Sequence, residues 1–133
     1  MTTVGFVCVQ NAGRSQMATA FAERERDRRD LDWDILTGGT LPADHVHAEV
    51  RDAMADVGID LSDRTPREVS DAELDSCDVV ATMGCSTLSL DTAVDLRDWD
   101  LPDPDGKSPE AVAEIRDDVE RRVVALFDEL EDA

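Results

Sequence analysis

The feature that most limits the fold is the continuous apolar run of residues 4–9, which leads through a short turn into a helix. The run has the length of one strand and no polar alternation, as is typical of a strand buried on both faces. Residues 10–13 have turn chemistry, and the apolar stripe that follows predicts a helix over residues 14–29. A buried strand that leads directly into a helix favours a parallel sheet covered by helices.

Strands and helices alternate along the rest of the chain. Apolar patterning predicts further strands at residues 33–37, 77–83 and 94–96, and helices at 47–57 and 71–74. A long last helix begins at Pro109, with Ser108 as its N-cap. Glycines set two of the boundaries, because Gly38 and Gly39 are expected to stop the second strand and Gly58 to end the second helix.

This order predicts one α/β domain over residues 1–133. We expect a three-layer fold in which a four-stranded parallel sheet is flanked by helices. Ligands in such folds bind at the carboxyl ends of the strands. Cys8 lies at the end of the first strand, and Asp103 follows the fourth.

The turn after the first strand has the residues of an oxyanion site. Five residues separate Cys8 from Arg14, between a buried strand and a helix N-terminus. Backbone N–H groups of such a loop can form a cup for a tetrahedral oxyanion, and the helix dipole favours its charge. Arg14 can grip two oxygens of the anion, and the same field favours a nucleophilic thiolate at Cys8. The predicted loop comprises Val9, Gln10, Asn11, Ala12, Gly13, Arg14 and Ser15.

Two polar residues of the loop have expected supporting roles. Asn11 tolerates the left-handed backbone conformation and can tie the loop together, and Ser15 can donate a hydrogen bond to the thiolate. The alternative is that Cys8 is only a small buried apolar residue, which is common at the end of a strand. The strand before it, the turn residues and the helix after it favour the functional interpretation. The loop lacks the Gly-Lys-Ser/Thr ending of a nucleotide-binding loop.

The charge of the chain excludes several partners. The chain has 32 acidic and 13 basic residues, a net charge of −19. We therefore expect no binding to nucleic acid or to an anionic membrane surface. Aspartates outnumber glutamates 22 to 10, and 12 of the 13 basic residues are arginines. We interpret this as the surface of a halophilic protein, whose self-repulsion molar salt screens; the alternative is an ordinary acidic domain.

The cysteines and histidines suggest no structural metal and no disulfide framework. Three cysteines without a C-x-x-C pair are typical of reduced thiols, and His45 and His47 match no metal spacing. No secretory signal or membrane-spanning run is found, so we expect a cytoplasmic protein. No metal or organic cofactor is implied. We expect Cys77 to be a buried structural cysteine.

Residues 6–18 resemble the signature of arsenate reductases built on the low-molecular-weight protein tyrosine phosphatase fold. Four further segments are similar to that family, so the resemblance covers nearly the whole chain. They are residues 37–47, 54–62, 78–85 and 99–107.

The resemblance implies a role for each matching residue. Cys8 is the nucleophile, Arg14 is the oxyanion clamp, and Asn11 and Ser15 support the loop and activate the thiol. Asp103 is the general acid that protonates the leaving oxygen. Cys85 occupies the position of the family's first resolving cysteine.

The sequence is compatible with more than one substrate and more than one reductant. Asp105-Gly106-Lys107 follows the Asp-Pro pair where phosphatases of this fold usually have aromatic residues, and the chain has no tyrosine. This favours arsenate over a phosphotyrosine peptide, so we expect an arsenate reductase. The alternatives are a low-molecular-weight phosphatase that hydrolyses phosphate monoesters, and a non-enzymatic oxyanion-binding or redox-sensing protein.

Arsenate reduction needs a second thiol after the cysteine–arsenic adduct has formed. Thioredoxin-coupled relatives have another cysteine a few residues after the first resolving one, but residues 86–92 contain none here. Two routes are left. Cys8 and Cys85 form a disulfide that an external reductant such as thioredoxin opens, or a small thiol or glutaredoxin-like protein attacks the adduct.

Overall fold

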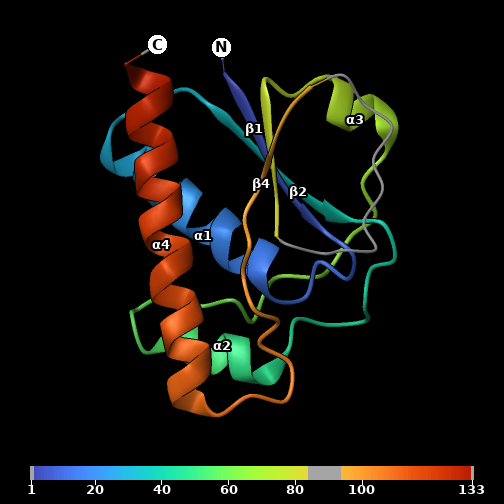
Figure 1. Ribbon diagram of the computed structural model, residues 1–133, viewed down its shortest axis with the longest axis vertical. Coiled ribbons are helices and arrows are strands. Elements are labelled where there is room, and N and C mark those ends of the chain that lie inside the picture. The colour runs from blue at the N-terminus through green and yellow to red at the C-terminus, as the bar shows by residue number, and fades with distance from the viewer. Residues whose placement is uncertain (1, 84–93, 133) are drawn as a thin grey trace.

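The computed structural model describes residues 2–83 and 94–132 (Figure 1). Its four-stranded sheet is entirely parallel and has the strand order β2-β1-β3-β4. This confirms the predicted fold class. The strands are β1 (Thr3–Cys8), β2 (Asp34–Gly39), β3 (Val79–Thr82) and β4 (Asp95–Asp98). The helices are α1 (Arg14–Arg28), α2 (Ala48–Ala55), α3 (Asp71–Asp75) and α4 (Pro109–Glu131).

The central strand β1 has apolar side chains on both faces, which explains its uninterrupted apolar run. Phe6 and Cys8 belong to the larger core, which packs against α1, α2 and α4. Val7 belongs to a smaller core on the other face, with Leu74 of α3 and Val80 of β3. In Figure 1, α1 and α4 lie on one side of the sheet and α3 lies toward the other. The sheet is therefore the middle layer of three.

The second strand continues through the two glycines that were expected to stop it. Gly38 pairs with Val7 and Gly39 pairs with Cys8. A Cβ atom at Gly38 would lie 2.6 Å from the Cβ of Val69, and one at Gly39 would lie 2.4 Å from the carbonyl oxygen of Val9. The glycines are therefore needed because other chain segments approach the strand closely, and they do not break it.

Helix boundaries follow the capping residues. The Oγ of Ser108 accepts a hydrogen bond from the N–H of Ala111, as expected of an N-cap. Helix α2 is shorter than predicted and ends at Ala55 in a Schellman motif, in which Ile59 N–H bonds to the Met54 carbonyl and Gly58 has φ +81°.

The boundaries of the other strands differ from the prediction by one or two residues. β3 begins at Val79 because the preceding residues still belong to the turn after α3, where Cys77 N–H bonds to the Leu74 carbonyl. β4 covers Asp95–Asp98 because it pairs with the whole of β3. In the described part of the chain, no helix combines the length and the apolar character needed to cross a membrane.

Candidate active site

The loop between β1 and α1 holds Cys8 in a polar, buried environment. The thiol lies at the carboxyl end of the central strand and is 4% exposed. The backbone N–H of Asn11 donates to its Sγ at 3.0 Å, and the Oγ of Ser15 lies 2.9 Å from the same sulfur. The Nδ2 of Asn11 donates to Ser15 Oγ at 2.8 Å, so the Ser15 hydroxyl is left to donate its own proton to Cys8. Two donors aimed at one sulfur favour its thiolate form.

Asn11 ties the loop to the surrounding structure. It is fully buried and has φ +53°, the left-handed conformation that its sequence position predicts. Its Nδ2 also donates to Thr37 Oγ1 of β2 at 2.8 Å. Its Oδ1 accepts from Gln16 Nε2 and from the backbone N–H of Arg67, both at 3.1 Å. The side chain therefore uses its full hydrogen-bonding capacity. Sequence reasoning missed Gln16, Thr37 and Arg67 as partners, because only the folded chain brings them together.

The segment after β2 forms hydrogen bonds with the carbonyl groups of the loop. The N–H groups of residues 40, 41, 43 and 47 donate to the carbonyls of Cys8, Val9, Gln10 and Ala12, at 2.8–3.3 Å. By contrast, the backbone N–H groups of four loop residues donate to no backbone carbonyl within residues 2–83 and 94–132. These residues are Val9, Gln10, Ala12 and Gly13. Carbonyls directed outward leave the N–H groups of the loop available for an anion.

Arg14 begins α1 at the carboxyl edge of the sheet and is half-buried. Its Nη1 donates to the carbonyl of Met83, directly after β3, at 2.6 Å, and to that of Leu101 at 2.8 Å. The guanidinium therefore joins the end of β3 to the segment that leads to Asp103. This position beside the loop is the one expected of an oxyanion clamp.

The Asp103-Pro104 pair lies against the same loop. A Cβ atom at Gly13 would meet the Cγ of Pro104 at 3.2 Å, so this proline covers the start of α1. Asp103 itself is exposed, and its Oδ1 accepts from the N–H of Asp105 at 3.0 Å. The fold thus brings Cys8, Arg14 and the Asp103 segment to one edge of the sheet, as the sequence predicts. Cys85 lies outside the described residues.

Cys77 and Cys8 belong to different cores, on opposite faces of the sheet. Cys77 belongs to the smaller core and is 6% exposed. Burial raises the pKa of its thiol to about 11, and the charges of Asp78 and Glu73 act in the same direction. The expectation that Cys77 is buried is confirmed.

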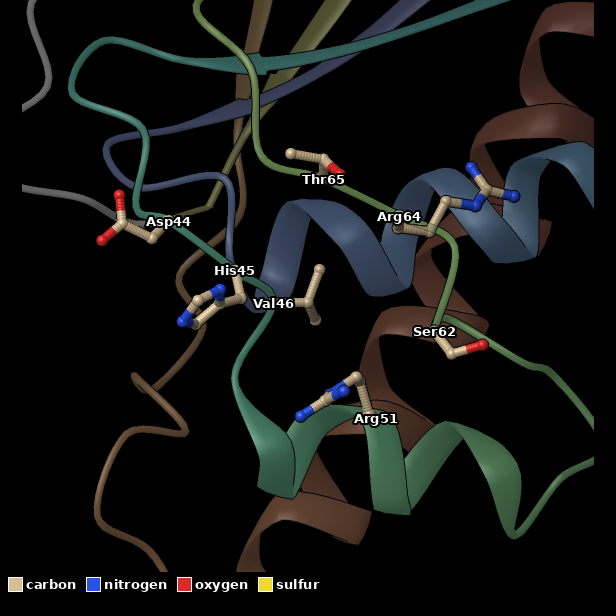
Figure 2. Close-up of a pocket in the computed structure, with 7 residues that line it drawn as sticks. All are labelled: Asp44, His45, Val46, Arg51, Ser62, Arg64 and Thr65. Carbon is tan, nitrogen blue, oxygen red and sulfur yellow. The ribbon is translucent and has the colours of Figure 1, made fainter.

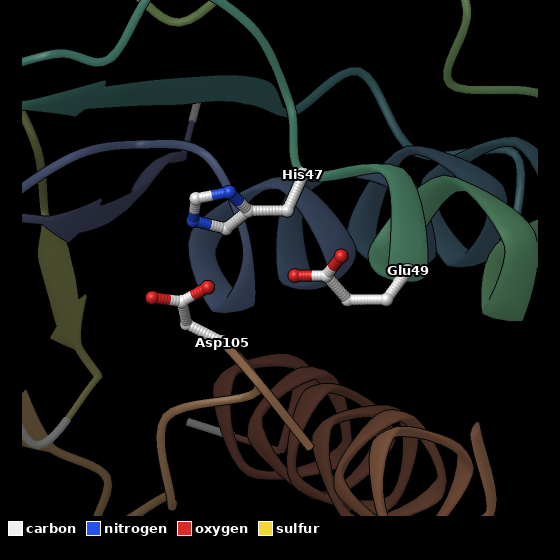
Figure 3. Close-up of side chains that lie close together, drawn as sticks. All are labelled: His47, Glu49 and Asp105. Atoms are coloured by element: carbon white, nitrogen blue, oxygen red, sulfur yellow. The ribbon is translucent and has the colours of Figure 1, made fainter. Parts of the chain in front are cut away.

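Two further groupings of side chains lie near the site. A hollow of about 360 Å³ lies between residues 44–46, Arg51 of α2 and residues 62, 64 and 65, and none of the predicted site residues lines it (Figure 2). His47, Glu49 and Asp105 lie together beside the loop, with one ligand atom of each within 4.8 Å of the others (Figure 3). They could hold a metal ion, although the sequence spacing of His45 and His47 indicated none.

Known proteins resemble the chain over almost its full length. A curated relative from Halobacterium salinarum, named "Putative arsenate reductase", is 71% identical over 96% of this chain and 92% of its own. The "Glutaredoxin arsenate reductase" of a Synechocystis strain is 35% identical over 96% and 97%. A solved structure described as an arsenate reductase in the phosphate-binding state superposes with a TM-score of 0.83 at 32% identity, covering 97% of this chain and 98% of its own. The family model for low molecular weight phosphotyrosine protein phosphatase matches residues 3–133, so the chain belongs to this family of enzymes.

Proposed function

We propose that this protein is an arsenate reductase that uses Cys8 as its nucleophile. The observation that carries the proposal is the pair of donors on the Cys8 sulfur, at the base of a loop whose carbonyls bond elsewhere. The relatives named as arsenate reductases support the choice of substrate.

The first step forms a bond between sulfur and arsenic. The Cys8 thiolate attacks As(V) of arsenate, and one arsenate oxygen leaves as water after Asp103 has donated a proton to it. The free N–H groups of the loop and the Arg14 guanidinium hold the remaining oxygens. The product is an arsenic adduct of Cys8 in which arsenic is still As(V).

The second step transfers two electrons. A second thiolate attacks the Cys8 sulfur, an S–S bond forms, and the S–As bond breaks with its electron pair left on arsenic. Arsenic is thereby reduced to As(III) and leaves as arsenite, while two thiols are oxidised to one disulfide. The second thiol is Cys85 or that of an external reductant. The name of the Synechocystis relative supports a glutaredoxin-like partner, and thioredoxin or a small thiol serves the same chemistry. This cycle requires a reducing compartment, so we place the protein in the cytoplasm.

The second candidate is a low-molecular-weight phosphatase, which the family model favours. Its reaction would use the same loop, with a phosphocysteine intermediate that water hydrolyses. The exposed Asp105, Gly106 and Lys107 after the Asp-Pro pair offer no aromatic surface for a phosphotyrosine ring. This observation makes phosphotyrosine a poorer substrate than an inorganic oxyanion.

A paired assay in about 2 M KCl distinguishes the two functions. One arm measures arsenite formed from arsenate, with thioredoxin, glutaredoxin and glutathione systems supplied in turn. The other measures hydrolysis of an aryl phosphate. Cys8→Ser is the control for both arms. We expect arsenite formation that Cys8→Ser abolishes; ester hydrolysis without arsenite under any reductant would assign a phosphatase.

Cys85→Ser identifies the second thiol in the same assay. If Cys85 resolves the adduct, the variant loses arsenite turnover and keeps ester hydrolysis. If an external thiol attacks the adduct directly, arsenite turnover survives with that reductant.

A further inference from the structure

We propose that His47, Glu49 and Asp105 form a binding site for a divalent transition metal such as Zn²⁺ or Co²⁺. His47 precedes α2, Glu49 lies in its first turn, and Asp105 comes from the segment that follows Asp103-Pro104. In Figure 3 the imidazole and the two carboxylates point toward one another across a common space. The site therefore joins two parts of the chain that are more than fifty residues apart in sequence.

The donor set fits the proposed class of metal. One imidazole nitrogen and two carboxylate oxygens suit a borderline ion better than Mg²⁺ or Ca²⁺, which prefer oxygen ligands alone. Ligand atoms around tetrahedral zinc lie about 3.4 Å apart, since each is bound at about 2.1 Å. The ligand atoms now lie within 4.8 Å of one another, so small rotamer changes in Glu49 and the exposed Asp105 would bring them to the spacing of a zinc site. Three protein ligands leave the fourth position of the metal to water.

In the described part of the chain, no ion pair or side-chain hydrogen bond occupies these three side chains. Neither carboxylate forms an ion pair there, and none of the three makes a side-chain hydrogen bond within residues 2–83 and 94–132. Ten of the twelve arginines are instead paired with other carboxylates. These are Arg24, Arg26, Arg28, Arg29, Arg64, Arg67, Arg97, Arg116, Arg121 and Arg122. Two converging carboxylates therefore keep a local negative charge that a bound cation would compensate.

Because the proposed metal site lies beside the oxyanion loop, a bound metal would affect the position of the Asp103 segment. The backbone N–H of Asp105 holds the carboxylate of Asp103 at 3.0 Å, and Pro104 packs over Gly13. The ring of His47 is also next to Gly13, since its Cδ2 would lie 3.7 Å from a Cβ atom there. A metal that joins His47 to Asp105 would therefore hold the Asp103 segment against the oxyanion loop.

The test is a Co²⁺ titration of the full chain in about 2 M KCl, followed by visible absorption and calorimetry, with Zn²⁺ as competitor. We expect one equivalent bound by the wild-type protein. His47→Ala and Asp105→Asn should each weaken binding at least tenfold. The matched controls are His45→Ala and Asp100→Asn, which remove an imidazole and a carboxylate from other exposed positions. They should change the affinity for Co²⁺ less than twofold.

Three results would overturn the proposal. These are no binding of Co²⁺ or Zn²⁺ by the wild-type protein, equal binding by His47→Ala, and a sulfur-to-cobalt charge-transfer band that Cys8→Ser removes. The last result would place the metal on the catalytic thiol. Hydrogen exchange of residues 103–107 tests the consequence, because Zn²⁺ should slow it in the wild type and leave it unchanged in His47→Ala. These readouts need no turnover, so they are independent of the proposed reductase activity.

Discussion

Asn11 is the residue on which the geometry around Cys8 depends most. Its backbone N–H bonds to the sulfur, and its side chain bonds to Ser15, Thr37, Gln16 and the backbone of Arg67. A left-handed φ of +53° is tolerated by asparagine better than by most other residues. One residue therefore satisfies both the conformation and the hydrogen bonding of the loop.

We predict that Asn11→Ala lowers the free energy of unfolding by about 2–4 kcal/mol, because it leaves buried polar partners without a bond. Asn11→Gly is the matched variant, since glycine keeps the left-handed backbone and removes the same side chain. Urea unfolding in about 2 M KCl measures both. A loss below about 0.5 kcal/mol in both variants would show that these hydrogen bonds contribute little.

Cys77 gives a prediction for the dependence of stability on pH. Burial is the main cause that raises its pKa to about 11 in the folded protein, well above the ordinary thiol value of about 8.5. The folded state therefore holds this proton more tightly than the unfolded state does. The stability that this provides is fully present below about pH 8.5 and is lost as the pH rises toward 11.

Cys77→Ala should flatten the fall in stability between pH 9 and 11. The chain has no tyrosine, so few other groups titrate in this range. Urea unfolding at pH 8.0, 9.5 and 10.5 measures the difference between the two proteins. A fall of the same steepness in Cys77→Ala would mean that another group causes it.

At the scale of elements, the strands and helices could be predicted because their signals are local. The apolar run of β1 and the capping residues Ser108 and Gly58 need only their sequence neighbours to be interpreted. The extension of β2 through Gly38 and Gly39 could not be predicted, because Val69 and Val9 make it necessary from distant positions.

The same distinction holds for the candidate site. The spacing of Cys8 and Arg14 predicts an oxyanion loop, and its location at the sheet edge follows from the fold. The bonds from Arg14 to the carbonyls of Met83 and Leu101 could not be predicted, nor could the meeting of His47 with Asp105. These contacts join segments whose relative positions only the folded chain defines.

Two glycines separate steric from conformational effects in a direct comparison. At Gly39 a Cβ atom would lie 2.4 Å from the Val9 carbonyl oxygen, whereas at Gly58 it would meet nothing within 4 Å, although φ is +81°. We predict that Gly39→Ala costs about 2–4 kcal/mol of stability and displaces the loop. Gly58→Ala should cost about 1 kcal/mol and leave activity unchanged. Urea unfolding and the arsenite assay test both; equal effects would contradict the close approach at Gly39.

At the scale of the whole molecule, the excess of negative charge is the main influence on the stability of the folded state. Arginines pair with carboxylates of distant segments: Arg29, directly after α1, pairs with Asp128 of α4, and Arg64 pairs with Glu23 of α1. The net charge is nevertheless −19, so most carboxylates repel one another. The screening length is about 10 Å at 0.1 M salt and about 3 Å at 1 M. The compact state should therefore need high ionic strength.

We predict that dialysis from about 2 M KCl into low-salt buffer causes loss of helical circular dichroism, and that added KCl restores it. Sucrose at matched osmolarity is the control, because it carries no charge and does not screen. An unchanged spectrum in low salt would contradict the halophilic interpretation of the surface.

The central claim is that the loop makes Cys8 a nucleophilic thiolate, and the rate of iodoacetamide alkylation against pH tests it directly. Peptide mass spectrometry resolves Cys8 from Cys77, which serves as the buried comparison in the same molecule. We predict that the Cys8 rate reaches half its maximum well below pH 8.5, the ordinary thiol value. It should shift upward in Ser15→Ala, and phosphate should slow it. A Cys8 midpoint at or above pH 8.5, insensitive to phosphate, would contradict the account.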